Sequence, residues 1–359
     1  MIHTYTARIN VCSDFYNQFI SHPQTKLYKE RSQVYKTAKN GLLQEIGITL
    51  YGHQYKISYD RITAAGATEQ ISYVNYVIDA RVNPSKVIYR ESAIDIYKPS
   101  DYEIFQQCFN HEIKSFNLPF LPPLDGWKAH RIDFTYNIHT PYVKDYIRLM
   151  HKADLRGFSI KKDQHGHRSM KPGSLYINNS AVTLNFYDKQ DEMIKAEGGT
   201  RHTPEEISQA KDILRIEVQA SRDKLSGIKR KQEFTSKQIS EFMQQPEAAE
   251  DLVISYASRV LGAATYRKKP AAITIINHSN KHQKTKEQLI AAIEAVSKPY
   301  KRVDEVRAAC PDLEIDKCKK LLREMDINIV NLDKNTKVKE LPSVPDLLRD
   351  AIEEERVRS

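Results

Sequence analysis

The chain has 359 residues, which is long for one domain and leaves room for a main domain and a smaller one. It contains no apolar run near the roughly eighteen residues that a membrane span needs, its N-terminus lacks the features of a secretory signal, and its 4 cysteines form no CxxC pair. These features argue against a membrane protein, a disulfide scaffold and a cysteine-based zinc site, and we expect a cytoplasmic protein whose net charge of +9 favours a polyanionic partner.

Two segments of the first half alternate apolar and polar residues with period two, which is typical of strands with one buried and one open face. The first runs from Val74, which we expect to face inward, to Val82, and it places Asp79 on the open face. The second covers 131–136 and presents Asp133 in the same way. We therefore expect the two carboxylates on the open side of one sheet.

The other expected elements up to residue 219 include both helices and strands. They are, in chain order, a helix over 100–116 capped by Ser100 and with Ile104 on its apolar stripe, a helix over about 142–153, a hairpin of 174–177 and 182–188, a helix that starts with a capping box at Thr203 and Glu206, and a strand over 213–219. Their order predicts an α+β fold with a central antiparallel sheet and flanking helices.

The strand pattern is most informative around residue 187. Because Leu184 and Phe186 point to the core, Tyr187 and Lys189 share the opposite, open face. In the strand over 213–219 the same alternation buries the even-numbered residues and presents Glu217.

Beyond about residue 225 the chain turns mainly helical, with only 273–276 resembling a strand. We therefore expect a first domain over 1–228 and a mostly helical second domain over 229–359. Within the latter, helices over 303–309 and 315–325 are close enough to form a helix-turn-helix that contacts duplex DNA, although an ordinary helical hairpin has the same pattern.

If these strands form one sheet, its open face carries the acids Asp79, Asp133 and Glu217 together with Tyr187 and Lys189. Three nearby carboxylates repel one another unless a cation lies between them, and their hard oxygen ligands suit Mg²⁺ or Mn²⁺. Such an ion could polarise a phosphate while the tyrosine hydroxyl attacks phosphorus and the lysine stabilises the phenolate.

A less reactive interpretation of the same face stays open. Acids on strands are usually solvated or paired with cross-strand cations, and Arg131 and Arg215 are in position to pair with them. If the two arginines are not used in this way, they are candidates for contacting DNA phosphates.

Four segments in order resemble the phage/plasmid replication protein family of the gene II/X type. They are Val77-Ile78-Asp79-Ala80-Arg81-Val82-Asn83-Pro84-Ser85-Lys86-Val87, Arg131-Ile132-Asp133-Phe134-Thr135, Leu184-Asn185-Phe186-Tyr187-Asp188-Lys189 and Leu214-Arg215-Ile216-Glu217-Val218. The resemblance covers residues from about 70 to 225 and extends more faintly to the C-terminus.

The resemblance implies a rolling-circle nickase fold and a defined activity. Members nick supercoiled DNA at a replication origin, leave a 3′-OH for the host polymerase and later rejoin the displaced strand. The family's nucleophilic tyrosine falls on Tyr187, two residues before Lys189, and its strand acids fall on Asp79, Asp133 and Glu217. It further implies origin DNA as partner, as supercoiled duplex and single strand, a host helicase, and the cytoplasm of a bacterial host.

The sequence departs from many rolling-circle endonucleases because it lacks a His-hydrophobic-His metal motif. The nearest approximation, His165-Gly166-His167, has a central glycine and lies in a polar stretch. A metal-dependent nuclease that uses water instead of tyrosine, and a non-catalytic DNA-binding regulator of replication or transcription, are the alternatives.

A basic run between Arg259 and Lys286 contains no Asp or Glu. Such a run is either a solvated surface or a phosphate-binding surface, and we expect Arg267, Lys268 and Lys269 to contact DNA phosphates.

Overall fold

The structure is a computed structural model, and it describes residues 1–28, 40–62, 68–90, 94–160, 173–196, 202–298 and 301–358. Residue contacts divide the chain into two compact units, each made of two stretches of sequence. The first unit comprises Met1–Phe134 and Ala220–Ala248, and the second comprises Thr135–Gln219 and Ala249–Ser359. The expected boundary at 228/229 falls inside helix α7 of the first unit.

The first unit is built on antiparallel strands in the order β2-β3-β4-β5-β1-β6. These strands are β1 (Ile2–Val11), β2 (Lys26–Tyr28), β3 (Asn40–Glu45), β4 (Ile48–Ile62), β5 (Thr68–Val82) and β6 (Lys128–His139), the last of which continues into the second unit. The helices and 3-10 turns of this unit are α1 (Ser13–Ser21), α2 (Pro84–Tyr89), η1 (Pro99–Asp101), α3 (Tyr102–Ser115), η2 (Leu124–Gly126), α7 (Arg222–Lys231) and α8 (Ile239–Gln244).

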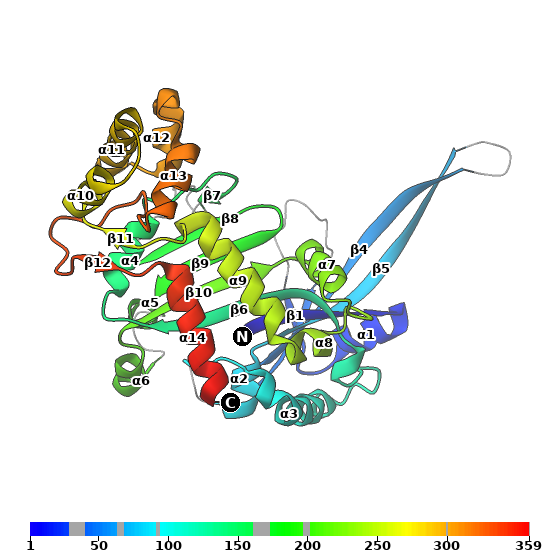
Figure 1. Ribbon diagram of the computed structural model, residues 1–359. Helices are drawn as coiled ribbons and strands as arrows, with labels where there is room; N and C mark the ends of the chain where they lie inside the picture. Colours follow the sequence, from blue (N-terminus) through cyan, green and yellow to red (C-terminus); the bar gives the residue numbers. More distant parts are fainter. Residues whose placement is uncertain are drawn as a thin grey trace. The chain divides into compact units, whose positions relative to one another are not determined.

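Strands β4 and β5 form a long hairpin that leaves the body of the first unit as a two-stranded ribbon (Figure 1). Each strand has 15 residues. Strand β5 begins at Thr68, six residues before the start that the alternation predicted. Val74, expected to face inward, is 47% exposed. Because β1 pairs with β5 only from Tyr76 to Val82, β4 is the strand that pairs with the earlier part of β5 in the described structure, and residues 68–74 are mostly exposed.

The core of the first unit packs α3 against the strands through aromatic rings. Phe105 and Phe109, one turn apart, are fully buried, and Phe105 makes an edge contact with Tyr5 while Phe109 makes one with Trp127, with ring centroids 6.3 Å apart in both pairs. Ile104, expected on the same stripe, is 50% exposed, because it lies at the edge of the face that these rings define. The expected cap at Ser100 is replaced by the 3-10 turn η1.

The second unit continues from β6 with strands in the order β10-β9-β8-β7. These are β7 (Ser159–Ile160), β8 (Ser174–Asn178), β9 (Val182–Asp188) and β10 (Ile213–Ala220), and β11 (Tyr266–Arg267) pairs separately with β12 (Glu340–Leu341). The helices are α4 (Val143–Met150), α5 (Lys189–Lys195), α6 (Pro204–Gln209), α9 (Pro246–Leu261), α10 (Lys269–His278), α11 (Gln283–Ser297), α12 (Val303–Ala309) and α13 (Ile315–Glu324), with η4 (Pro311–Leu313) and α14 (Val344–Arg358).

Local sequence signals explain several of these elements. The β8–β9 hairpin is antiparallel, as predicted, and the Asn179 side chain holds its turn by accepting hydrogen bonds from two backbone N–H groups. The capping box of α6 is also confirmed, since Thr203 Oγ1 accepts from the Glu206 N–H and Glu206 Oε2 accepts from the Thr203 N–H. The chain is thus α+β with an extensive antiparallel sheet, and it is mainly helical after residue 225, as predicted.

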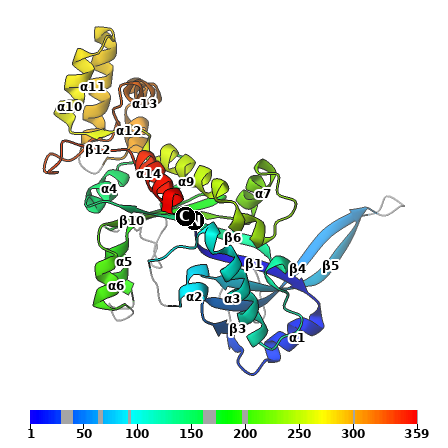
Figure 2. The same cartoon turned by 60° about the horizontal axis from the view of Figure 1, so that its bottom comes forward.

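Helices α10 and α11 lie side by side, with α12 and α13 next to them (Figures 1 and 2). The expected strand over 273–276 is wrong, because these residues lie within α10. Pro270 in the first turn starts that helix, and the burial of Ala272 and Ile276 at helical spacing outweighs the β-branched composition. No helix in the described ranges is long and apolar enough to cross a membrane.

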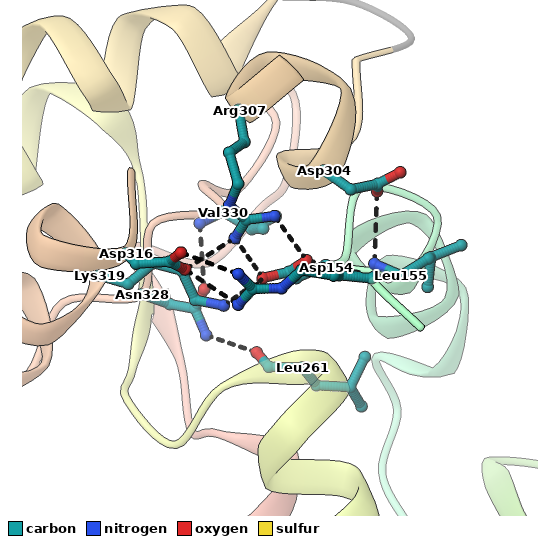
Figure 3. A network of polar contacts seen from close by, with 10 residues as sticks. Asp154, Leu155, Leu261, Asp304, Arg307, Asp316, Lys319, Asn328 and Val330 are labelled. Carbon is teal, nitrogen blue, oxygen red and sulfur yellow. Dashed lines mark hydrogen bonds and ion pairs between the residues drawn. The ribbon is translucent and has the colours of Figure 1, made fainter. Parts of the chain in front are cut away.

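An ion-pair network joins α12 and α13 to the segment after α4 (Figure 3). Buried Asp154 accepts hydrogen bonds from Arg307 on α12 at 3.1 and 2.6 Å and from Lys319 on α13 at 2.6 Å. Asp316 in turn accepts from Arg156 and Arg307. The two helices of the expected helix-turn-helix are therefore present, but Lys319 is held in this network and Lys317 pairs with Glu314.

Candidate functional site

The site in the second unit is a buried tyrosine bonded to a carboxylate. On β9 the even-numbered residues Leu184 and Phe186 pack into the core, which turns Tyr187 to the opposite face, as the alternation predicted. Its hydroxyl donates a hydrogen bond of 2.6 Å to Oε1 of Glu217 on β10. The two residues are only 6% and 5% exposed, so this short bond is shielded from water.

The surroundings keep the phenol protonated. Burial raises the pKa of Tyr187 well above its ordinary value, and the negative charge of Glu217 raises it further, while the charge of Arg215 acts in the opposite direction. Removal of the tyrosine proton therefore has to accompany any reaction of the oxygen. Glu217 is the carboxylate placed to accept that proton.

Lys189 lies on a helix, whereas the strand pattern predicted that it continues strand β9. Strand β9 ends at Asp188, whose side chain caps α5 by accepting from the Asp191 N–H, so Lys189 is the first residue of a helix. Its ammonium group lies 2.7 Å from Glu192 Oε2. Burial and the neighbouring charge of Arg215 lower the pKa of Lys189, partly offset by Glu192 and Glu217.

Arg215 is buried completely, and its Nε donates to Asn137 Oδ1 at 2.8 Å. The open face that the alternation predicts for this arginine is wrong. Its buried positive charge lowers the pKa of Lys189 and opposes the rise in the pKa of Tyr187.

In the first unit, Asp79 is paired with an arginine. Nε and Nη2 of Arg8 donate to its two oxygens at 2.6 and 2.8 Å, and His53 Nε2 lies 3.3 Å from Oδ2. Burial alone would raise the pKa of Asp79, but the hydrogen bonds and charges of Arg8 and His53 outweigh it and lower the pKa to about 2. The carboxylate is ionised and compensated by its protein partners.

Asp133 has the same kind of partner. It is 3% exposed, and Arg131, two residues earlier on β6, donates to it through Nε at 2.7 Å and Nη2 at 2.5 Å. Of the two roles that the sequence left open for Arg131, pairing with the acid is the one observed. The bidentate geometry engages both carboxylate oxygens.

The expected solvent-open face is wrong for all five residues, because Asp79, Asp133, Tyr187, Lys189 and Glu217 are each at most 6% exposed. The alternation identified the non-core parity of each strand correctly, but that side of the strands is also covered. A period-two pattern cannot distinguish water from a polar packed layer.

Two of the three acids proposed as metal ligands, Asp79 and Asp133, are each engaged by an arginine. Within the described ranges, no group of three or more His, Cys, Asp or Glu side chains could hold a metal ion. Asp79 and Asp133 belong to the first unit and Glu217 to the second, so the clustering of all three stays a prediction. His165-Gly166-His167 lies outside the described residues.

The basic run is acid-free in sequence but not in space. Arg267 pairs with Asp326 at 3.0 Å and with Glu340, and Lys281 pairs with Glu324 at 3.0 Å. Lys268 donates to the Lys334 carbonyl at 3.3 Å, and Lys269 is exposed at the start of α10. Only part of the run is therefore available for phosphates without breaking an ion pair.

Sequence reasoning missed Arg8 and His53, the partners of Asp79. Arg8 lies directly opposite Asp79 in the β1–β5 register, and His53 lies on β4, the other neighbour of β5. The alternation of Tyr5, Ala7 and Ile9 would have predicted β1, but not which strand it pairs with.

Comparison of the chain with protein-family models, with curated proteins and with solved structures gives no match.

Proposed function

We propose that the chain initiates rolling-circle DNA replication by nicking one strand at an origin, with Tyr187 as the nucleophile. The observation that carries this proposal is the 2.6 Å hydrogen bond from the Tyr187 hydroxyl to Glu217, which pairs a nucleophile with a base. The four ordered segments that resemble the gene II/X type of replication protein, one of which contains Tyr187, support it independently.

The proposed reaction is a transesterification. The Tyr187 oxygen attacks a backbone phosphorus as its proton passes to Glu217, a bond forms between oxygen and phosphorus, and the bond from phosphorus to the 3′ oxygen breaks. The 3′ oxygen leaves as a hydroxyl after taking up a proton, and the 5′ phosphate stays on the tyrosine. Since the phosphodiester is exchanged and not hydrolysed, attack by a 3′-OH reseals the strand without ATP.

The remaining side chains support this step electrostatically. Lys189 is a buried ammonium with a lowered pKa, which suits it to give a proton to the leaving oxygen. A requirement for Mg²⁺ or Mn²⁺ remains a prediction, and a metal bound by Asp79 or Asp133 would have to displace the arginine that holds each of them. Attack also requires the buried hydroxyl to become accessible when DNA binds.

Substitution of the nucleophile tests the proposal. Supercoiled DNA that carries the region flanking the chain's own gene is incubated with protein and Mg²⁺ or Mn²⁺, and covalent adducts are separated by denaturing electrophoresis. Tyr187→Phe keeps the ring but removes the oxygen, so it should form no adduct and leave the DNA supercoiled. Tyr146→Phe is the matched control, because that buried hydroxyl in the same unit donates to a backbone carbonyl, that of Pro342 at 3.0 Å, instead of to a carboxylate.

The rival functions give different results in the same assay. A nuclease that activates water would nick DNA without an adduct and would keep nicking after Tyr187→Phe. A non-catalytic regulator would leave the DNA uncut even with the unmodified protein. An adduct that survives Tyr187→Phe would assign the chemistry to another residue.

A further inference from the structure

A second feature of the molecule, a groove in the first unit, is unrelated to the tyrosine site. It has a volume of about 1150 Å³, larger than the roughly 300–1,000 Å³ typical of small-molecule pockets. Its walls come from β1, α1, β4, β5, the segment from Phe120 to Gly126, β6, α7 and the segment after α7. The basic residues that line it are Arg8, Lys128, His130, Arg222, Lys229 and Lys237, and no Asp or Glu is among its described lining residues.

Among the residues that the structure describes, most of the Lys and Arg side chains of the groove form no ion pair with an acid. Within the described part of the chain, Lys128 and Arg222 form no ion pair, Lys229 donates to the Thr235 carbonyl at 3.1 Å, and Lys237 donates to the Ser226 hydroxyl. Arg8 differs, since it is bound to Asp79 behind the groove. The groove therefore has a local excess of positive charge.

The positive charges of the groove also shift the pKa values of two of its basic groups. Burial lowers the pKa of His130, and the charges of Arg8 and Arg222 lower it further against the opposing effect of Asp79. Burial and the charges of Arg222 and Lys229 lower the pKa of Lys237, with Asp223 opposing them. Like charges held close together in this way favour an anionic ligand.

Aromatic side chains lie in the same groove. Phe15 and Phe120 stack with centroids 4.7 Å apart and planes inclined by 8°, and Phe15 is still 41% exposed. On the hairpin, Tyr73 is 49% exposed, and Tyr55 accepts a hydrogen bond from Asn75 at 2.7 Å. Exposed rings beside unpaired cations are the two components of a surface that binds unpaired bases and their phosphates.

We propose that this groove binds single-stranded nucleic acid, with Lys128 and Arg222 on the phosphates and Tyr73 and Phe15 stacking on the bases. A duplex hides its base faces, so it could use the cations but not the rings. An acidic peptide likewise offers charge without planar faces. The groove chemistry stands by itself, whereas the choice of DNA as the nucleic acid rests on the proposed function.

The test measures the binding of a fluorescein-labelled 12-nucleotide oligo-dT to the full chain carrying Tyr187→Phe, so that cleavage cannot interfere. The competitors are a duplex, an oligo-U and an abasic deoxyribose-phosphate strand, all of the same length. Oligo-dT should bind more tightly than the duplex and the abasic strand. If replacing Tyr73 or Phe15 with Leu weakened duplex binding as much as oligo-dT binding, the proposal would be overturned, and preference for oligo-U over oligo-dT would overturn the choice of DNA.

Two kinds of groove variant separate charge from stacking. Lys128→Gln with Arg222→Gln should weaken binding of both oligo-dT and the abasic strand, and should reduce the salt dependence by about 0.7 for each phosphate that is no longer neutralised. Tyr73→Leu and Phe15→Leu should weaken oligo-dT binding by about tenfold each and leave the abasic strand unaffected. Lys56→Gln is the matched control, because Lys56 lies between Tyr55 and Ile57 on β4 and points to the other face of the hairpin.

Photo-crosslinking gives a result that does not depend on the folding of variants. Oligo-dT with 5-iododeoxyuridine should crosslink to Phe15, Tyr55, Tyr73 or Phe120, and crosslinks confined to peptides outside the groove would contradict the proposal. If the unmodified protein binds oligo-dT in the groove but never nicks DNA, the proposed function fails while the groove assignment stands.

Discussion

The buried strand acids of the two units have different partners. In the first unit, Asp79 and Asp133 each receive two hydrogen bonds from an arginine, which compensates their charge. In the second unit, Glu217 accepts a hydrogen bond from the neutral hydroxyl of Tyr187, and it raises the pKa of that hydroxyl. The arginine contacts of Asp79 and Asp133 compensate buried charge and so stabilise the fold, whereas the contact between Glu217 and Tyr187 places a carboxylate where it can accept the proton of a phenol.

The comparison predicts opposite effects for two matched amide substitutions. Glu217→Gln removes the proton acceptor and should lower the nicking rate by about 10²–10⁴-fold, the usual contribution of a general base, with little change in thermal stability. Asp79→Asn removes half of an ion pair and should lower stability while the folded protein still nicks DNA. The measurement is the single-turnover rate of adduct formation, together with thermal unfolding of each variant.

The contrast fails in either of two ways. If Asp79→Asn abolished nicking in protein shown to be folded, Asp79 would belong to the catalytic machinery, as the strand pattern predicts. If Glu217→Gln nicked DNA at the unmodified rate, the hydrogen bond between Glu217 and Tyr187 would be only a packing contact.

Removal of the cation in the first unit should cost more stability than removal of the acid. Arg8→Met leaves the buried Asp79 carboxylate beside His53 but without its arginine, and we expect a loss of about 3 kcal/mol in the free energy of unfolding. The double variant Arg8→Met with Asp79→Asn no longer buries that charge and should be more stable than Arg8→Met alone. Urea unfolding of the three variants measures this, and strictly additive losses would refute the coupling.

The same pair predicts acid sensitivity. Because the pKa of Asp79 is lowered to about 2 in the folded chain from an ordinary 3.8, its contribution is present in full above about pH 4 and is lost as the pH falls from 4 to 2. The shift corresponds to about 2 kcal/mol. Asp154 also has a lowered pKa, so the test compares the unmodified chain with Asp79→Asn, whose urea midpoint should fall less over this range. Parallel acid profiles would show that Asp79 is not the group responsible.

Local patterns in the sequence were sufficient for much of the fold. The alternation around Phe186, the capping box at Thr203 and the hairpin of 174–177 and 182–188 depend on neighbouring residues, and all three are observed. The helix over 269–278 was missed because burial of one helical face overrides the β-branched composition of Ile273–Ile276.

The candidate site was harder to predict because its chemistry depends on long-range pairing. The parity of Tyr187 and Glu217 on their strands was correct, but their direct hydrogen bond required knowing how the strands pack. The division into two units also could not be inferred from linear order, since each unit takes two separate stretches of chain. The groove could not be inferred from linear order either, because its basic and aromatic side chains come from segments far apart in sequence.

The smallest expected effect concerns the basic run from Arg259 to Lys286. A basic side chain of this run that is paired with an acid should stabilise the fold, and one without such a pair should bind DNA phosphates. Lys269 is exposed and Lys268 donates to a carbonyl, so replacing both with Gln should weaken binding to every DNA sequence alike and flatten the logarithmic salt dependence by up to about 1.8, or 0.9 per duplex phosphate. Arg267→Gln breaks ion pairs with Asp326 and Glu340 and should lower the melting temperature with little effect on the salt slope. Fluorescence anisotropy with duplex DNA at several salt concentrations measures the binding and its salt slope, and thermal unfolding measures the melting temperature. An unchanged salt slope in the double lysine variant would mean that the run is only a solvated surface. A slope that changed only in Arg267→Gln would show that Arg267 is the residue that binds phosphates, in competition with Asp326 and Glu340.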